Sequence, residues 1–169
     1  MVGQACGAVN ERTAAIVTVS DSVAAGGAED RSGPRAAELV AEAGFSIVEV
    51  VVVPDGVESV RSVLDRLIGE VDLVVTTGGT GLGPRDLTPE ATAAVIEREV
   101  PGLSEAMRAA TFDTVPFGKL SRGMSGVAGR CLIVNLPGSP KAVEEGLGII
   151  GDVLGHAVDV ASGRFGRHG

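Results

Sequence analysis

A glycine-rich segment between two apolar stretches carries residue types suited to binding phosphate. It runs Thr76-Thr77-Gly78-Gly79-Thr80-Gly81-Leu82-Gly83-Pro84-Arg85-Asp86 and leads to a helix start at Thr88-Pro89-Glu90, with Thr88 as its predicted N-cap. Glycines let backbone N–H groups approach an anion closely, and a helix N-terminus adds positive potential. A plain strand-to-helix turn seldom needs four glycines within six residues. The segment therefore favours an anion site.

Two other loops repeat this arrangement. Ser20-Asp21-Ser22 follows an apolar run, and Asn135-Leu136-Pro137-Gly138-Ser139-Pro140 ends another, with Ser139 predicted to cap the next helix. The string Asp30-Arg31-Ser32-Gly33-Pro34 opens a further helix, and Asp30 is interpreted as its cap. In open α/β sheets, ligands bind at the carboxyl ends of strands. We expect these loops to share one crevice that holds a small phosphorylated ligand.

Aspartates beside the predicted phosphate site are candidates for catalysis. Asp86 directly follows the glycine-rich segment, and Asp55 and Asp21 each follow a predicted strand. A carboxylate near phosphate indicates an intervening divalent cation or an activated nucleophile. Structural alternatives are a helix cap for Asp86, a type I turn for Asp55 and an Asx-turn for Asp21. Ser121-Arg122 is either a phosphate contact or a surface pair.

Position or spacing excludes the other catalytic and cofactor-binding motifs that the sequence could suggest. Gly146-Leu-Gly148-Ile-Ile-Gly151 fits a dinucleotide fingerprint but falls inside the last predicted helix, where close helix packing explains it. The two histidines, His156 and His168, have no partner at metal-ligand spacing, and no nucleophile elbow is present. These residues predict a Mg²⁺-assisted phosphate or nucleotide enzyme, with no metal ligands assigned to the protein itself.

The elements that position these residues alternate between strands and helices. Apolar runs predict strands buried on both faces at Ala14 to Val19, Ser46 to Val53, Val71 to Thr77 and Cys131 to Leu136. Helical patterns cover Pro34 to Ala43, Val57 to Ile68, Thr88 to Glu99, Leu103 to Thr111 and Ser139 to about Val160. Pro116 to Arg130 predicts loops or a small hairpin. The alternation predicts an α/β fold with a mostly parallel sheet.

Composition restricts the classes of function. The chain has 169 residues, a net charge of −8 and 2% aromatic residues, which argues against nucleic acid as a partner. No apolar run is long enough to span a membrane, and Met1 to Thr13 lacks signal-peptide features. Cys131 is predicted to be a buried small residue rather than a disulfide partner of Cys6. We expect a single cytoplasmic domain over 1–169, with an ordered core at about 13–160 and a frayed, basic, Gly-rich tail at 162–169.

Taken together, the motifs resemble the MogA/MoaB family of molybdenum cofactor biosynthesis, which includes the G domain of gephyrin. The similarity covers Thr13 to about Val160 in the family's order. The matching strings are Thr18-Val-Ser-Asp-Ser22, Asp30-Arg-Ser-Gly-Pro-Arg35, Val53-Pro-Asp55, Thr77-Gly-Gly-Thr-Gly81, Pro84-Arg-Asp86, Thr88-Pro-Glu-Ala-Thr92, Pro101-Gly-Leu103, Leu120-Ser-Arg122 and Asn135-Leu-Pro-Gly-Ser-Pro140.

The resemblance implies a three-layer α/β/α domain that assembles as a homotrimer. It implies a Mg²⁺-dependent transfer of AMP from ATP to molybdopterin, with release of pyrophosphate and delivery of the product to a molybdate-inserting partner enzyme. Asp86 matches the essential aspartate and Asp55 a second functional one. The residues expected to bind molybdopterin or nucleotide are Ser20, Asp21, Thr77, Gly78, Gly79, Thr80, Gly81, Arg85, Ser121, Pro137, Gly138 and Ser139.

Three alternatives to this enzyme remain open from the sequence. The first is a non-catalytic molybdopterin carrier, against which the retention of both Asp55 and Asp86 argues. The second is a nucleotide pyrophosphatase like the related domain of the CinA family, which would release pyrophosphate without a pterin. The third is a scaffold, for which the chain offers no interaction segment beyond the domain.

Overall fold

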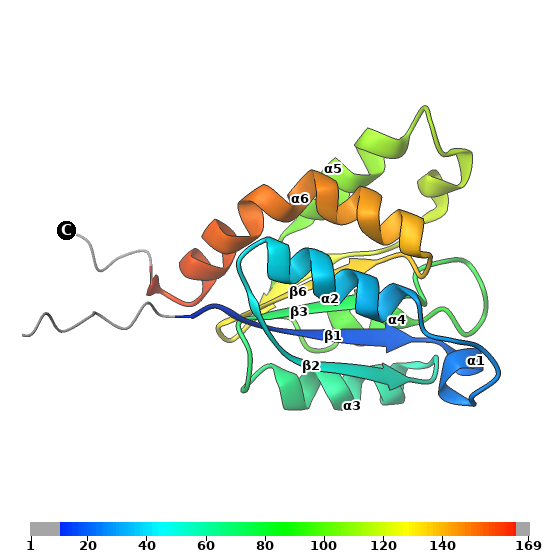
Figure 1. Ribbon diagram of the computed structural model, residues 1–169, viewed down its shortest axis with the longest axis horizontal. Coiled ribbons are helices and arrows are strands. Elements are labelled where there is room, and N and C mark those ends of the chain that lie inside the picture. The colour runs from blue at the N-terminus through cyan, green and yellow to red at the C-terminus, as the bar shows by residue number, and fades with distance from the viewer. Residues whose placement is uncertain (1–10, 165–169) are drawn as a thin grey trace, which may run out of the picture.

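Six strands form one sheet with helices on both faces (Figure 1). The computed structural model describes residues 11–164. In chain order, the elements are β1 (Thr13–Val19), α1 (Asp21–Ala24), α2 (Ser32–Glu42), β2 (Ser46–Val53), α3 (Val57–Leu67), β3 (Leu73–Thr77), α4 (Thr88–Ala93), β4 (Arg98–Glu99), α5 (Pro101–Thr111), the 3₁₀ helix η1 (Pro116–Leu120), β5 (Ser125–Ala128), β6 (Cys131–Leu136) and α6 (Pro140–Ala161).

The strand order is β2-β1-β3-β6-β5-β4. The sheet is mostly parallel, as predicted. β1 pairs in parallel with both β2 and β3, and β3 pairs in parallel with β6. The segment before β6 contributes β5, which pairs antiparallel to β6 as a hairpin. β2 lies on one side of β1, and after β2 the chain crosses over so that β3 lies on the other side of β1. The strand order therefore reverses between β1 and β3, where their carboxyl ends open a crevice.

Two apolar layers cover the sheet because alternate side chains of each strand face opposite sides. Ile16 and Val75 belong to the core beneath α2, α5 and α6. Val17 and Val74 belong to the core beneath α3 and α4. Figure 1 shows α2, α5 and α6 on one face and α3 and α4 on the other. Among residues 11–164, no helix is both long and apolar enough to cross a membrane.

The helix predicted from Thr88 to Glu99 is wrong in its second half. α4 ends at Ala93, and the chain then extends into β4. The N–H of Glu97 donates to the carbonyl of Val127, and the N–H of Val100 donates to the carbonyl of Ser125. Pairing with the β5–β6 hairpin therefore overrides the local helical pattern after Ala93.

β2 is not buried on both faces, contrary to the expectation for its apolar run. It forms the edge of the sheet, and the side chains of Val48 and Val50 are 56% and 42% exposed. An apolar run of this length is compatible with an edge strand as well as a central one, because periodicity alone does not assign its place in the sheet.

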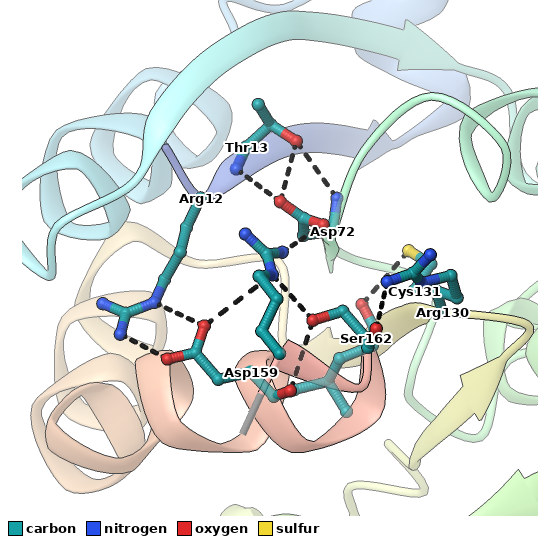
Figure 2. Close-up of polar contacts among 9 residues, drawn as sticks. Arg12, Thr13, Asp72, Arg130, Cys131, Asp159 and Ser162 are labelled. Carbon is teal, nitrogen blue, oxygen red and sulfur yellow. Dashed lines mark hydrogen bonds and ion pairs between the residues drawn. The ribbon is translucent and has the colours of Figure 1, made fainter. Parts of the chain in front are cut away.

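An ionic cluster joins the two ends of the described chain at the amino-terminal edge of the sheet (Figure 2). Arg12 donates two hydrogen bonds to the carboxylate of Asp159, at 3.0 and 2.7 Å. Thr13 donates through its N–H to Asp72 at 2.9 Å, and Arg164 forms an ion pair with the same carboxylate. The expected fraying is therefore wrong for Ser162, which is buried, and for the ion-paired Arg164. Residues 165–169 of the tail, with His168, and Cys6 lie outside the described residues.

Candidate functional site

The carboxyl ends of β1, β3 and β6 surround a cavity of about 800 Å³ at the reversal of strand order. This volume lies within the range of pockets that hold small molecules. The predicted site residues that line it are Ser20, Asp55, Thr77, Gly78, Gly79, Thr80, Gly81, Asp86, Ser121, Pro137 and Gly138. The three loops identified in the sequence therefore meet around one space.

The glycine-rich loop after β3 is hydrogen-bonded at its first residue, whereas its next N–H groups have no partner among the described residues. The N–H of Gly78 donates to the carbonyl of Leu136 at 3.0 Å, and φ is +97° at Gly78 and +65° at Gly79. A Cβ at Gly78 would collide with the carbonyl oxygen of Val19. Within residues 11–164, the N–H groups of Gly79, Thr80 and Gly81 donate no hydrogen bond. These donors are available to an anion at the wall of the cavity.

The sequence predicted that Thr88 caps the helix after this loop, and this prediction is wrong. Thr88 is the first residue of α4, and Leu87 occupies the N-cap position without a side-chain hydrogen bond. The hydroxyl of Thr88 donates instead to the carbonyl of Gly78 at 2.9 Å, and its N–H donates to the carbonyl of Gly79 at 3.1 Å. Thr88 therefore holds the start of the glycine loop against the end of β3.

Asp55, in the loop after β2, lies near Gly79, whereas Asp86 lies near Gly81 and Gly83, and each carboxylate is held by one backbone N–H. Asp55 Oδ2 accepts from the N–H of Asp21 at 2.8 Å, and Asp86 Oδ2 accepts from the N–H of Gly83 at 2.8 Å. Neither carboxylate forms a hydrogen bond through Oδ1 to another described residue. Each aspartate therefore keeps one oxygen for a cation or a ligand. Neither accepts the helix-capping bond that was the alternative for Asp86.

Asp21 and Arg85 lie beside the cavity rather than in its wall. Arg85 donates from Nε to Asp21 Oδ2 at 2.5 Å and from one terminal nitrogen to Asp21 Oδ1 at 3.0 Å and to the carbonyl of Asp55 at 2.7 Å. The hydrogen bonds from Arg85 hold the pKa of the Asp21 carboxyl below its ordinary value. This pair ties the glycine loop to the two aspartate loops from outside the cavity.

Ser139 is also absent from the cavity wall, where the resemblance had led us to expect it. Its hydroxyl accepts from the N–H of Ala142 at 3.2 Å and so caps α6, as its place before Pro140 predicted. Ser121, in contrast, faces the cavity from the loop after η1. Of the two interpretations of Ser121-Arg122, the cavity position fits a ligand contact for Ser121.

The cavity includes residues that the sequence reasoning left out. Asp30 lines it beside Arg31, and its carboxylate accepts hydrogen bonds from the Thr18 hydroxyl at 2.7 Å and the Gly33 N–H at 2.9 Å. Arg31, and not Asp30, occupies the N-cap position of α2, but Asp30 still accepts from the first turn of this helix and lines the cavity wall. The segment from Val115 to Leu120 forms an apolar side of the cavity, with the Phe117 side chain 79% exposed. No sequence pattern marks this segment, because the exposure of its apolar side chains is visible only in the folded chain.

Carboxylates outnumber cations on the cavity wall. Glu29, Asp30, Asp55 and Asp86 face it, and Arg31 is the one guanidinium or ammonium group among the described lining residues. Within residues 11–164, no three His, Cys, Asp or Glu side chains form a metal-binding group. This donor set suits Mg²⁺ that arrives with a polyphosphate, because Mg²⁺ is commonly bound by one or two carboxylates together with substrate phosphates.

Known proteins are similar to this chain in sequence and in fold. A family model described as a probable molybdopterin binding domain matches residues 15–156. The chain is 40% identical over 150 residues to the molybdenum cofactor synthesis protein cinnamon of Drosophila melanogaster, with 86% of this chain and 25% of that protein covered. It therefore spans about a quarter of the length of cinnamon.

Shorter relatives match over most of their own length. A molybdopterin adenylyltransferase of Helicobacter pylori is 36% identical over 154 residues, which cover 89% of this chain and 88% of that enzyme. The crystal structure of the molybdopterin biosynthesis enzyme MoaB from Thermus thermophilus superposes with a TM-score of 0.85 at 42% identity, covering 90% of this chain and 97% of that one.

Proposed function

Because the chain belongs to the molybdopterin-binding domain family, we propose that it is an adenylyltransferase that transfers AMP from ATP to molybdopterin and releases pyrophosphate. The observation that carries this proposal is the placement of Asp55 and Asp86, each with a free carboxylate oxygen, around one cavity with the unpaired N–H groups of the glycine loop. Relatives named molybdopterin adenylyltransferase align over most of both chains, which supports the same activity.

The proposed reaction is a displacement at the α-phosphorus of ATP. An oxygen of the molybdopterin phosphate forms the new bond to this phosphorus, and the bond to the bridging oxygen of the β-phosphate breaks, so that pyrophosphate leaves with the electron pair. A phosphate monoester is largely ionised at pH 7 and needs no strong base. Catalysis then rests on alignment of the two phosphates and on neutralisation of their charge.

The described residues divide these tasks between them. The N–H groups of Gly79, Thr80 and Gly81 bind phosphate oxygens from the loop after β3. Asp86 and Asp55, each with a free carboxylate oxygen, would hold the Mg²⁺ that accompanies ATP. That ion supplies charge neutralisation between the phosphates when bound. Ser121, Pro137 and Gly138 close the wall on the side of β6.

The remaining parts of the proposal come from the family resemblance and the sequence. We propose a homotrimer in the cytoplasm that passes its adenylylated product to a molybdate-inserting enzyme. A mass measurement by light scattering on the purified chain tests the trimer independently of the reaction.

Pyrophosphate release tests the proposed activity. We expect release from ATP and Mg²⁺ only when molybdopterin is added, and a loss of at least about 100-fold in the Asp86→Asn variant. An Asp65→Asn variant serves as the control, because Asp65 lies on α3 and pairs with Arg61, away from the cavity.

The outcomes separate the proposal from its alternatives. Tight molybdopterin binding without pyrophosphate release would mean a carrier. Pyrophosphate release from ATP without any pterin would mean a nucleotide pyrophosphatase. Full turnover in Asp86→Asn with unchanged Mg²⁺ dependence would remove the role assigned to Asp86.

A further inference from the structure

Arg122 holds the glycine loop by hydrogen bonds to its backbone and does not line the cavity. Its Nε donates to the carbonyl of Gly81 at 2.9 Å, and a terminal nitrogen donates to the carbonyl of Asp86 at 2.5 Å. Its own N–H donates to the carbonyl of Thr80 at 2.9 Å. Arg122 does not line the cavity, whereas its neighbour Ser121 does. The arginine therefore acts on the loop and not on a ligand.

The two carbonyls that Arg122 holds are the ends of the segment 81–86. Inside this segment, the N–H of Gly83 donates to the Asp86 carboxylate, and the N–H of Asp86 donates to the carbonyl of Gly83. Among the described residues, Arg122 is the only outside group that hydrogen-bonds to the backbone of the segment. The Arg85 side chain adds a second attachment at the exposed end.

Glu90 fixes the orientation of the Arg122 guanidinium. Both carboxylate oxygens of Glu90, in the first turn of α4, contact terminal nitrogens of Arg122. The guanidinium thus bridges α4, the loop after η1 and both ends of segment 81–86. Its planar fork presents donors in several fixed directions, which a lysine ammonium on its flexible stem does not.

We propose that Arg122, oriented by Glu90, is a positioning residue that sets the place of Asp86 in the reaction. The proposal rests on the proposed adenylyltransferase function for its kinetic consequence. Without Arg122, the backbone of segment 81–86 loses its hydrogen bonds to the rest of the fold, and the internal bonds of Gly83 and Asp86 open more often. Small displacements of a positioned group reduce turnover strongly, whereas substrate binding at the other loops is retained.

The kinetic test compares wild type with Arg122→Lys in pyrophosphate release. We expect kcat to fall about 10- to 100-fold, while KM for MgATP and for molybdopterin changes less than about threefold. Arg66→Lys is the matched control, because Arg66 also pairs with two carboxylates, Glu49 and Glu70, on α3 away from the cavity. Its kcat should equal that of wild type.

A double variant distinguishes positioning of Asp86 from a general structural effect. If Arg122 acts through Asp86, Arg122→Lys should reduce the residual turnover of Asp86→Asn by less than about twofold. Additive losses would overturn the proposal, as would an unchanged kcat in Arg122→Lys. A rise in KM with kcat unchanged would also overturn it, because it would place Arg122 in substrate binding.

Amide hydrogen exchange tests the same attachment without any turnover. In Arg122→Lys, the N–H groups of Gly83 and Asp86 should exchange at least about tenfold faster, while the strands β1, β3 and β6 exchange as in wild type. Unchanged exchange in segment 81–86 would overturn the proposal. If wild type releases no pyrophosphate, the proposed function fails, and this exchange measurement alone decides whether Arg122 holds the loop.

Discussion

At the scale of single residues, the site depends on positions where the backbone leaves no room for a side chain. Gly79 combines a φ of +65° with a position against the Thr88 hydroxyl and the Asp55 carboxylate. A side chain there has to displace one of these two groups, and both contribute to the site. The glycine therefore keeps the N–H groups of the loop, the start of α4 and Asp55 in mutual contact.

Replacing Gly79 with alanine should damage activity more than stability. The new methyl group meets Thr88 Oγ1 and Asp55 Oδ1, so we expect turnover to fall at least about 100-fold, because the loop and Asp55 are displaced. Steady-state pyrophosphate release together with thermal denaturation measures both effects. Gly69→Ala is the control, since a Cβ at Gly69 meets no atom within 4 Å. Equal turnover in the two variants would contradict this account of Gly79.

At the scale of elements, one buried asparagine joins three segments behind the cavity. The side-chain amide of Asn135, in β6, donates to Thr76 in β3 and to Thr92 in α4, both at 3.0 Å. Its side-chain oxygen accepts from the N–H of Met124, before β5, at 3.3 Å. Asn135 is 1% exposed, so water does not replace these bonds when they are lost. The asparagine thus fixes β3, β6 and α4, which carry the glycine loop.

Substituting Asn135 with alanine should destabilise the fold by about 2–3 kcal/mol, because it leaves the buried hydroxyls of Thr76 and Thr92 and the part-buried N–H of Met124 without this partner. Thr92→Val is a milder comparison that removes a single hydroxyl at nearly constant volume, with an expected cost of about 1 kcal/mol. Urea denaturation of both variants gives the free energies of unfolding. The interpretation fails if Asn135→Ala is no less stable than Thr92→Val.

The elements also mark how far the sequence predicts this fold. Continuous apolar runs predicted β1, β3 and β6 within two residues at each end, because all three are buried in the middle of the sheet. The pattern failed for α4, where pairing of residues 97–100 with the β5 hairpin ends the helix. It also failed for β2, because an edge strand and a central strand can share one apolar pattern.

For the site, the sequence predicted which loops converge but not the partner of each side chain. Composition and helix starts identified the glycine loop, and strand ends identified Asp55 and Asp86. Asp30 is held at the cavity by Thr18, which is 12 positions away in the sequence. Asp21 pairs outside the cavity with Arg85, which is 64 positions away. Such contacts have no local periodicity from which a single sequence could predict them.

At the scale of the whole molecule, both ends of the described chain are fastened at the edge of the sheet opposite the cavity (Figure 2). Burial alone would raise the pKa of Asp72, but hydrogen bonds from Arg164 and Thr13 outweigh it and hold this pKa below its ordinary value. Hydrogen bonds from Arg12 likewise lower the pKa of Asp159, against a smaller opposing effect of burial. The two ionised carboxylates therefore stabilise the closed ends of the fold.

The sign of these shifts predicts how stability depends on pH. A carboxylate whose pKa is lower in the folded state stabilises the fold above its unfolded pKa of about 4, and this stabilisation is lost as the pH falls through the folded value. Asp72→Asn should therefore be less stable than wild type by about 1–2 kcal/mol at pH 7. The difference should shrink below about pH 4, where wild-type Asp72 becomes protonated.

Denaturation curves at pH 7 and at about pH 3 measure this difference. Asp65→Asn is the matched control, because Asp65 is 55% exposed in its pair with Arg61 and should give the same curve as wild type. A stability difference between wild type and Asp72→Asn that stays constant across the two pH values would contradict an ionised, stabilising Asp72.

The most direct test of the central claim follows the α-phosphate of ATP. Purified chain is incubated with Mg²⁺, molybdopterin and ATP labelled at the α-phosphate, and the products are separated and identified by mass. The account predicts that the label moves to adenylylated molybdopterin in equal amount to the pyrophosphate released, and that Asp86→Asn abolishes this transfer. Label that appears only in free AMP, or that stays in ATP while molybdopterin is bound, would contradict it.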